Sequence, residues 1–357
     1  MKEIKINLKN PYSVIVTSTN SHLNFWFEQK KVGKIFIITD QNVDSIYADY
    51  FRSFEHKIIG KYIIKPGEDS KRIETILDIY RVLLNNNVDR KCTLIAFGGG
   101  VVGDIAGFVA STYKRGTNLV YVPTTIISQT DSSVGGKNGF NLDGIKNIIG
   151  TFYQPNLVYI DVNLIKTLDY KNFKNGMAEV IKYGLSLDEN LFRFIEENKR
   201  AIKEREIDKL KYIVSECVKL KAGIVERDEL DLGERHILNF GHTIGHAVET
   251  MFDFNILHGE AVAIGMVYES YIALKRKLIS EDIFERLIKI LEYFELPTNI
   301  KINNYKRFKD IICKDKKNVD NNIKIVLPQG IGRAIITTDV KADTIVQNIQ
   351  EYNRRLL

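Results

Sequence analysis

The sequence predicts an α/β protein of two domains, in which a doubly wound parallel sheet is followed by a mainly α-helical part. Short apolar runs alternate with helical patterns through the first half of the chain, as is typical of strands covered by helices. Beyond about residue 172, longer amphipathic stretches replace them. A chain of 357 residues, 44% of them hydrophobic, can bury two cores. We therefore expect an N-terminal domain at 1–172 and a C-terminal domain at 173–357.

The composition argues against several classes of protein. Lys and Arg total 51 against 45 Asp and Glu, and the resulting charge of +6 is not gathered into a tail or an arginine-rich arm. We interpret it as solvated surface with some positive potential for an anionic small molecule, and we expect no nucleic-acid partner. Cys92, Cys217 and Cys313 lack CxxC spacing, which favours a reducing cytoplasm over a disulfide framework. Met1–Lys9 alternates like an exposed strand, and no run of about 18 apolar residues exists to span a membrane.

The first half begins with strands and a helix. Lys34–Asp40 and Tyr62–Lys65 are short apolar runs that we interpret as strands buried on both faces. Asp69 or Ser70 can then cap a helix that ends at the three asparagines 85–87. The apolar face of this helix is expected to contain Ile73, Ile76, Leu77 and Tyr80.

A glycine-rich turn follows the third predicted strand, Thr93–Phe97. The three glycines 98–100 lead through Asp104 into a helix. Glycines at such a turn let backbone N–H groups approach a pyrophosphate, and the positive end of the helix favours negative charge. The turn lacks GxGxxG spacing and is also compatible with a plain tight corner, but nucleotide binding is favoured. The next predicted strand, 118–122, ends in threonine hydroxyls where the carboxyl end of a sheet meets its ligand.

Segment 128–139 is too polar and glycine-rich for an element of the core. It carries Asp131 and Lys137, and Lys146 and Asn147 follow shortly after. Two lysines with an aspartate and amides in a flexible loop suit a phosphorylated polyol. An ordinary mobile surface loop explains the same composition equally well.

The second half carries three closely spaced histidines. On a helix His242 and His246 share a face, and His258 follows after a break that is wide enough for a second helix to return. A catalytic zinc usually has three protein ligands and an open position, so two histidines and one carboxylate suffice. Thr243 stands where the protease motif HExxH needs its glutamate. A single histidine is more often a satisfied core residue, but three together beside glycines favour a metal.

Glu179 is the carboxylate that we expect to complete this metal site. It pairs with Lys182 at i,i+3 on the predicted helix 176–184. Such a pair is more often a surface ion pair. Both residues lie among apolar neighbours, however, where a charge needs a partner.

The remaining charged residues of the second half are less informative. Residues 188–227 are predicted to be helical with a mostly solvated face, and Lys221 lies near their end. Arg235 is expected to open the histidine helix. Lys316 precedes a predicted hairpin within 323–337, and its position favours exposure over contact with a phosphate.

Taken in order, these motifs resemble the 3-dehydroquinate synthases of the shikimate pathway, within the sugar-phosphate cyclase family. The resemblance runs from about residue 34 to 330 and rests on residues 98–104, 131–137, 146–147, 179–184, 239–246 and 258–260. It implies an N-terminal NAD domain of Rossmann-like fold, a helical metal-binding domain, an active site in the cleft and a homodimer.

Carried over position by position, the resemblance implies a role for each of these residues. Glu179, His242 and His258 bind one divalent zinc or cobalt ion, and His246 supports that site or contacts substrate. For NAD the matching residues are Asp40, Asn42, Glu68, Lys71, Gly99, Gly100, Asp104, Thr124, Thr125, Lys137 and Lys146. For substrate they are Arg115, Asp131, Lys137, Lys146, Asn147, Lys182, Lys221, Arg235, Asn239, His246 and Lys316. The catalytic candidates are Lys137, Lys182, Asn239 and His246. Asn138 and Phe140 stand where a smaller or hydroxyl-bearing residue is expected, which leaves the packing of this loop open.

The reaction that the resemblance implies explains why these metal-, NAD- and anion-binding residues occur together. The family's substrate is a small phosphorylated sugar acid, 3-deoxy-D-arabino-heptulosonate 7-phosphate, which is converted to 3-dehydroquinate and phosphate. NAD transiently oxidises an alcohol that the metal polarises, so that phosphate can be eliminated. Re-reduction, ring opening and an intramolecular aldol closure then complete the reaction without net redox change. The cations hold phosphate and carboxylate, while Asn239 and His246 can move protons.

Three other functions compete with this one. A glycerol-dehydrogenase-like NAD and metal oxidoreductase shares both parts of the fold but does not need so many anion-binding residues. A sibling sugar-phosphate cyclase is expected to differ at the positions of Lys221, Asn239 and His246. A non-catalytic protein that binds nucleotides or nucleic acid is suggested only by the net charge.

Overall fold

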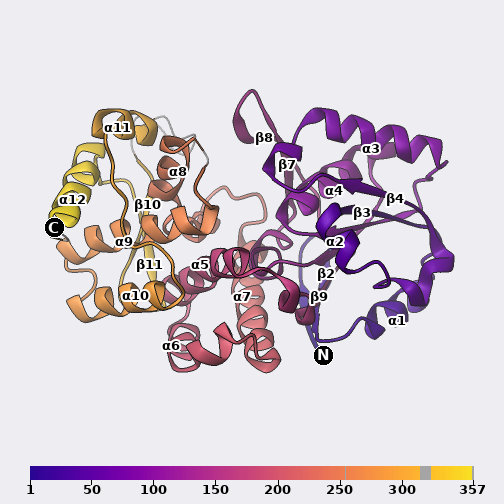
Figure 1. Cartoon of the computed structure of the whole chain (residues 1–357), viewed down its shortest axis with the longest axis horizontal. Helices are drawn as coiled ribbons and strands as arrows, with labels where there is room; N and C mark the ends of the chain where they lie inside the picture. The colour runs from indigo at the N-terminus through magenta and orange to yellow at the C-terminus, as the bar shows by residue number, and fades with distance from the viewer. Residues whose placement is uncertain (254, 314–322, 356–357) are drawn as a thin grey trace. The chain divides into compact units, whose positions relative to one another are not determined.

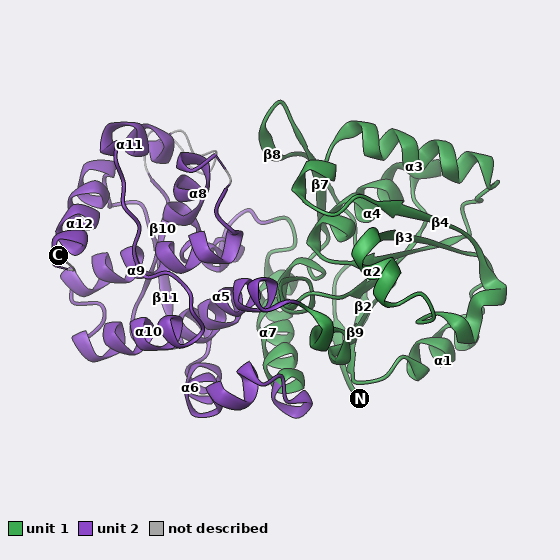
Figure 2. Cartoon of the chain, in the orientation of Figure 1, with its two compact units in different colours: residues 1–168, 210–230 green, residues 169–209, 231–357 purple. Residues whose placement is uncertain are grey.

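The computed structural model describes residues 1–253, 255–313 and 323–355. They form two compact units, which Figure 2 colours separately. Unit 1 contains Met1–Leu168 and Leu210–Leu230, and unit 2 contains Asp169–Lys209 and Asp231–Leu357. The chain therefore returns to the first unit after entering the second, whereas the sequence suggested a single boundary near residue 172.

Unit 1 is built on a seven-stranded sheet with strand order β1-β2-β9-β6-β5-β3-β4 (Figure 1). Its strands are β1 Lys2–Ile6, β2 Tyr12–Thr17, β3 Ile35–Asp40, β4 Ile58–Ile64, β5 Thr93–Gly98, β6 Asn118–Pro123 and β9 Leu157–Asp161. All neighbouring strands pair in parallel except β1 and β2 at one edge. The predicted doubly wound sheet is thus confirmed, and β3, β5 and β6 are buried as predicted. The expectation of burial on both faces was wrong for Tyr62–Lys65, because β4 lies at the edge of the sheet and is mostly half-buried or exposed.

Helices cover this sheet and complete its core. They are α1 Ser21–Gln29, α2 Gln41–Ile46, α3 Ile73–Asn85, α4 Gly100–Thr112 and α7 Ile207–Arg227, with the short helices η1 Arg52–Lys57, η2 Glu68–Ser70, η3 Tyr113–Arg115 and η5 Val162–Thr167. Leu23 and Phe27 of α1 join Ile95 and Phe97 of β5 in one hydrophobic cluster. Helix α4 packs against β5 and β6, so the glycine-rich turn lies directly between a buried strand and a covering helix.

The start of α3 differs from the prediction. Asp69 and Ser70 do not cap it, because both belong to η2, and Arg72 occupies the N-cap without a side-chain hydrogen bond. The chain turns inward here and buries Ser70 and Lys71. The apolar face is also rotated, since Leu77 is exposed. The buried residues of this helix are Ile76, Ile79 and Leu83.

Segment 128–139 is not a mobile surface loop, so that interpretation was wrong. Residues Ser128–Ser132 form a single π-helical turn, η4, and Lys137–Leu142 is a strand, β7, that pairs with β8 (Ile145–Phe152). Gln129 and Thr130 are fully buried. The amide of Gln129 donates to the carbonyl oxygens of Pro123 and Asp161 at 3.0 and 2.9 Å. Backbone carbonyl groups thus accept the buried side-chain N–H groups of Gln129, which lowers the cost of burying this amide.

Helix α7 joins unit 1 through contacts with β1 and the residue that follows it. Lys2 donates to the carboxylate of Glu216 at 2.9 Å, and the backbone N–H of Asn7 donates to Glu226 at 2.6 Å. These contacts connect residues that are more than two hundred positions apart. Local patterns therefore could not assign α7 to the first unit.

Unit 2 is mainly helical, as predicted. Its elements are α5 Tyr170–Leu187, α6 Glu189–Lys203, η6 Glu234–Asn239, α8 His242–Met251, α9 His258–Lys275, α10 Glu281–Tyr293, α11 Tyr305–Cys313, β10 Ile325–Pro328, β11 Ala334–Thr337 and α12 Ala342–Arg355. Helix α9 is the central element, since it packs against α5, α8, α10, α12 and β10 and is buried along most of its length. The hairpin β10–β11 is confirmed. Within the described residues, no helix combines the length and apolar character needed to cross a membrane.

One helix boundary in unit 2 was predicted incorrectly. Arg235 does not open the histidine helix but lies in the separate 3-10 turn η6. Gly241 divides η6 from α8 by adopting a left-handed conformation with φ of +78°. This conformation costs glycine little because it has no Cβ. The result is that α8 begins at His242 itself.

Candidate functional site

The three side chains that were predicted from the sequence to bind a metal lie together in unit 2. Glu179 projects from the middle of α5, whereas His242 and His258 are the first residues of α8 and α9. Nε2 of His258 is 3.1 Å from Oε1 of Glu179, and Nε2 of His242 is 3.5 Å from the same oxygen. One donor atom from each residue lies within 4.8 Å of the others. The three donors therefore face a common point.

Close helix packing brings these donors together. A Cβ atom at Gly259 would lie 1.9 Å from the carbonyl oxygen of Asn175 on α5, and one at Gly265 would lie 1.9 Å from the carbonyl oxygen of Gly241. Only glycine lets α9 approach its neighbours this closely. The backbone N–H of Gly259 also donates to Oδ1 of Asn175. Asn175 and Glu179 are one turn apart on α5, so this contact fixes Glu179 relative to His258.

A buried carboxylate fixes the start of α8. Glu269 on α9 is fully buried and accepts the backbone N–H groups of Gly241 and Ile244 at 2.6 and 3.2 Å. These N–H groups at a helix N-terminus have no partner within the helix, and a negative charge there is favourable. The position of His242 is therefore set from α9 as well.

The groups around Glu179 keep its side chain ionised. Nζ of Lys182 is 2.6 Å from Oε2 of Glu179, and both side chains are almost completely buried. Burial alone would raise the pKa of Glu179, but Lys182 and the two histidines outweigh it and hold this pKa well below its usual range. Burial and the charge of Lys182 lower the pKa of His242. Burial also disfavours the charged form of His258, but hydrogen bonds to Glu179 and Glu249 raise its pKa to about 10.

This donor set fits a divalent metal. An ionised carboxylate and two imidazoles are the ligands of many catalytic zinc sites. A second group, His246, Glu249 and His258, also has donor atoms within 4.8 Å of one another and shares His258 with the first. The two ring nitrogens of His258 face different carboxylates, because Nε2 faces Glu179 and Nδ1 is 3.5 Å from Oε2 of Glu249.

The other predicted residues of unit 2 surround this cluster to different degrees. Lys182 contacts it directly and also donates to the carbonyl oxygen of Leu238 at 2.8 Å. The ring of His246 lies 5.3 Å from that of His242, centroid to centroid. Asn239 ends η6, and Arg235 is buried earlier in the same turn. Lys316 lies outside the described residues.

A second polar cluster, in unit 1, joins three predicted nucleotide-binding residues to Asn147. Lys71 is buried, and its Nζ lies 2.6 Å from Oδ2 of Asp104 and 3.8 Å from Oε1 of Glu68. The same ammonium donates to the side-chain oxygen of Asn147. Burial raises the pKa of Asp104, although the charge of Lys71 opposes that shift. Nucleotide and substrate candidates therefore share one network.

Asn141 belongs to this network and was not predicted. Its Nδ2 donates to Glu68 at 2.9 Å, and its Oδ1 accepts the backbone N–H of Asn147 at 2.9 Å. A polar residue in a strand without alternating pattern gives no periodic signal. Its position between Lys137 and Lys146 is the only hint that the sequence contains.

A third pair in unit 1 connects α7 to the η4 turn. Nζ of Lys221 donates to the carboxylate of Asp131 at 2.7 Å and to its backbone carbonyl at 2.8 Å. Lys221 is only 6% exposed, so the expectation of a solvated face was wrong at this position. Lys137 and Arg115 are exposed, and Lys146 is partly buried.

The glycine turn is tightly enclosed. Gly99 is the N-cap of α4 and Gly100 its first residue. A Cβ at Gly99 would lie 3.1 Å from Cγ2 of Thr125, and one at Gly100 would lie 3.4 Å from Oγ of Ser132. The backbone N–H of Thr124 donates to Gly98 at 3.0 Å. The predicted glycines and threonines therefore lie side by side at the carboxyl ends of β5 and β6.

Asp40 and Asn42 have a local role that the sequence reasoning missed. The carboxylate of Asp40 accepts the backbone N–H groups of Asn42 and Val43 at 2.9 and 3.1 Å and so caps α2. Burial raises the pKa of Asp40, and these two hydrogen bonds oppose the shift. The signal was an aspartate directly after a strand and before a helix.

The structure resolves the packing of Asn138 and Phe140. Asn138 is buried, accepts the hydroxyl of Tyr121 at 2.6 Å and donates to the carbonyl of Gly136 at 2.8 Å. A Cβ at Gly107 of α4 would lie 1.8 Å from Oδ1 of Asn138, so a glycine makes room for this amide. Phe140 is buried edge-on against Phe108, with ring centroids 5.0 Å apart. Both unexpected side chains are therefore accommodated.

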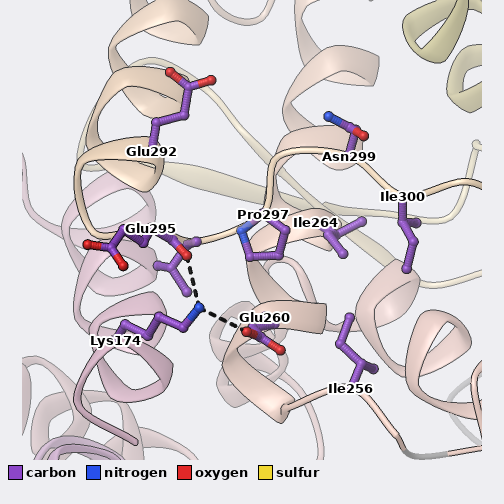
Figure 3. A pocket seen from close by; sticks show the side chains of 10 residues that line it. Lys174, Ile256, Glu260, Ile264, Glu292, Glu295, Pro297, Asn299 and Ile300 are labelled. Carbon is purple, nitrogen blue, oxygen red and sulfur yellow. Dashed lines mark hydrogen bonds and ion pairs between the residues drawn. The ribbon is translucent and has the colours of Figure 1, made fainter. Parts of the chain in front are cut away.

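Unit 2 also contains a cavity of about 570 Å³ beside the first turn of α9 (Figure 3). Lys174 lies at its edge and is 3.1 Å from both the carboxylate of Glu260 and the carbonyl oxygen of Glu295. None of the predicted site residues lines this cavity. The candidate site is therefore identified by its metal-binding side chains and not by this cavity.

Comparisons with known proteins show the family to which the chain belongs. Family models for the N-terminal and C-terminal parts of 3-dehydroquinate synthase match residues 61–175 and 176–318. The 3-dehydroquinate synthase of Clostridium tetani is 44% identical over 355 residues, which cover 98% of this chain and 95% of the relative.

Solved structures share the fold over the whole chain. A 2-epi-5-epi-valiolone synthase from Streptomyces hygroscopicus with NAD+ and Zn2+ bound has a TM-score of 0.89 at 27% identity, with 99% of each chain covered. A 2-deoxy-scyllo-inosose synthase complexed with carbaglucose-6-phosphate, NAD+ and Co2+ has a TM-score of 0.88 at 24% identity, covering 98% of this chain and 100% of the other. From the family models and the full-length identity, the chain belongs to the 3-dehydroquinate synthase family.

Proposed function

We propose that the chain is a 3-dehydroquinate synthase, which converts 3-deoxy-D-arabino-heptulosonate 7-phosphate to 3-dehydroquinate and phosphate. The observation that carries this proposal is the cluster of the buried Glu179 with the partly buried His242 and His258 beside Lys182, in a chain that matches 3-dehydroquinate synthases over nearly its full length. A metal site with an adjacent cation suits an alcohol that is oxidised close to an anionic group.

In this proposal each unit holds one of the two bound groups. Glu179, His242 and His258 hold one zinc or cobalt ion in unit 2, and NAD binds in unit 1 at the glycine turn. When bound, these groups supply polarisation of an alcohol and reversible hydride transfer. The proposed NAD residues are Asp40, Asn42, Glu68, Lys71, Gly99, Gly100, Asp104, Thr124, Thr125, Lys137 and Lys146.

The tight space at the glycine turn supports the NAD assignment. Gly99 and Gly100 are partly exposed at the start of α4, and side chains there would contact Thr125 and Ser132. The positive end of that helix favours a pyrophosphate. The bound NAD+ of the valiolone synthase, at 27% identity, gives independent support.

The substrate carries a phosphate and a carboxylate, and the proposed contacts are mostly cations. They are Arg115, Lys137, Lys146, Lys182, Lys221, Arg235 and Lys316, together with the polar residues Asp131, Asn147, Asn239 and His246. Lys182, Lys221 and Arg235 are buried. Lys182 and Lys221 already pair with Glu179 and Asp131, and lysine and arginine can also bind phosphate and carboxylate through charge-assisted hydrogen bonds.

Lys137, Lys182, Asn239 and His246 are the proposed catalytic residues. Lys182 holds Glu179 ionised and in a fixed orientation through their 2.6 Å contact. His246 lies beside His242 and can accept and return a proton at a ring nitrogen. Asn239, whose Nδ2 is 3.1 Å from Nδ1 of His236, can orient a substrate hydroxyl by hydrogen bonding.

The test is phosphate release with NAD well below the substrate concentration. We expect many equivalents of phosphate per NAD and no free NADH, because the hydride is returned before product leaves. One NADH per phosphate would mark a net dehydrogenase and overturn the proposal. A parallel incubation with a sugar phosphate that lacks the carboxylate tests for a sibling cyclase, and preferential turnover of that compound would favour the sibling.

Two further expectations accompany this proposal. The family resemblance supports a homodimer, which the particle mass in solution would test. The three cysteines are free thiols, which suits the proposed reducing cytoplasm.

A further inference from the structure

We propose that Glu249 positions the metal ligand His258, by accepting a hydrogen bond from Nδ1 so that Nε2 is presented to the metal. This inference rests on the metal site of the proposed function. It assigns a role to a buried carboxylate that the reaction itself does not use.

His258 stands between two carboxylates from two different helices. Its Nε2 lies 3.1 Å from Oε1 of Glu179 on α5, and its Nδ1 lies 3.5 Å from Oε2 of Glu249 on α8. Each ring nitrogen therefore faces one carboxylate. A ring that turned over would exchange the two partners, so this pairing selects one orientation of the imidazole.

Burial shows why the ring needs this contact. The side chain of Glu249 is 5% exposed, and a carboxylate in that environment needs hydrogen-bond donors. The side chain of His258 is 35% exposed, so packing covers only part of the ring. A hydrogen bond to Glu249 therefore supplies the restraint that packing leaves incomplete.

The other histidine of the site is held in the same way. Nδ1 of His242 lies 3.0 Å from the carbonyl oxygen of Phe240, while its Nε2 faces Glu179. Both histidines thus have an acceptor at Nδ1 and direct Nε2 towards the same carboxylate. Histidines that bind metals usually donate their second N–H to a carboxylate or a carbonyl, which fixes the tautomer and the ring. Here the carbonyl of Phe240 is the acceptor for His242, and the carboxylate of Glu249 is the acceptor for His258.

The same geometry argues against Glu249 as a ligand in place of Glu179. Glu179 reaches Nε2 of both His242 and His258. Glu249 faces the remaining nitrogen, Nδ1, of His258. In the alternative metal site formed by His246, Glu249 and His258, His258 would have to bind the metal through Nδ1, and Glu179 would not be a ligand.

The test compares Glu249→Ala and Glu249→Gln with the wild type by measuring zinc affinity in competition with a chromogenic chelator. Loss of an outer hydrogen-bond partner typically weakens metal binding by about 10- to 100-fold, and we expect this for alanine. Glutamine keeps an acceptor oxygen and should restore part of the affinity. NAD affinity and the unfolding midpoint of the metal-free protein should change little. If the alanine variant does not fold, the test is made with Glu249→Gln, whose zinc affinity should be lower than that of the wild type.

Glu196→Gln is the matched control. It removes a carboxylate of unit 2 that contacts Arg286 at 2.6 Å, on α6. This variant should bind zinc like the wild type.

Three outcomes would contradict the reasoning, and they are distinguishable. Wild-type zinc affinity in Glu249→Ala overturns the positioning role alone. Suppose instead that Glu249→Ala loses zinc as completely as His258→Ala, while Glu179→Ala retains it. Glu249 would then be a metal ligand, which also overturns the positioning role. Failure of the wild type to bind one zinc ion removes the proposed metal site instead.

Discussion

Replacing Gly259 with alanine should move His258 away from Glu179 and weaken the metal site. The new Cβ would lie 1.9 Å from the carbonyl oxygen of Asn175 and 2.7 Å from its carbonyl carbon. Since non-bonded heavy atoms pack best at about 3.5 Å, α5 and α9 must separate by roughly 1.5 Å at this point. The Oδ1 atom of Asn175 would also lie 2.6 Å away, but rotating this side chain would not relieve the contact with the backbone oxygen.

The expected magnitudes follow from this displacement. Overpacking of this kind costs about 1–3 kcal/mol of the free energy of unfolding. Misplacement of a reacting group by about 1 Å can lower the rate by roughly 100-fold. The assays are urea unfolding, zinc affinity and phosphate release under saturating NAD. All three should be impaired in Gly259→Ala.

Gly223→Ala is the control for this prediction. Gly223 lies in α7, and the nearest atom to its added Cβ would be Nη1 of Arg227 at 3.6 Å. Alanine in a helix interior is favoured over glycine by roughly 0.5–1 kcal/mol, so this variant should be unchanged or slightly more stable. Wild-type zinc affinity and an unchanged urea midpoint in Gly259→Ala would show that the close approach of α5 and α9 does not position the ligands.

Two other substitutions test the proposed sites separately. His258→Ala should remove metal and activity together, because the carboxylate and one imidazole leave an incomplete ligand set. Stoichiometric zinc with normal turnover in that variant would exclude the site. Gly100→Val should weaken NAD binding by about tenfold or more, since a side chain there obstructs the approach of a pyrophosphate to the backbone and a loss of about 1.4 kcal/mol of binding free energy corresponds to a factor of 10. Calorimetric titration with NAD checks this, zinc content should stay intact, and unchanged NAD affinity in the folded variant would place the cofactor elsewhere.

The sequence by itself determined the class of fold, most of the buried strands and the family resemblance. These features depend on local information. A continuous apolar run such as 93–97 predicts a buried strand, and the three glycines after it permit a close backbone approach. The order of the motifs identified the family without any contact being known.

Tertiary structure decided the contacts between distant segments. Asp131 and Lys221 are ninety residues apart and meet only because α7 returns to unit 1. Segment 128–139 is polar, yet most of it is buried, and carbonyl oxygens of β6 and β9 accept the side-chain N–H groups of Gln129. Helical spacing alone treats His242 and His246 alike. Only the packing of α5, α8 and α9 shows which ring nitrogens face Glu179 and that Glu249 lies behind His258. Such contacts depend on how helices approach one another in space, and the sequence within each helix does not contain that information.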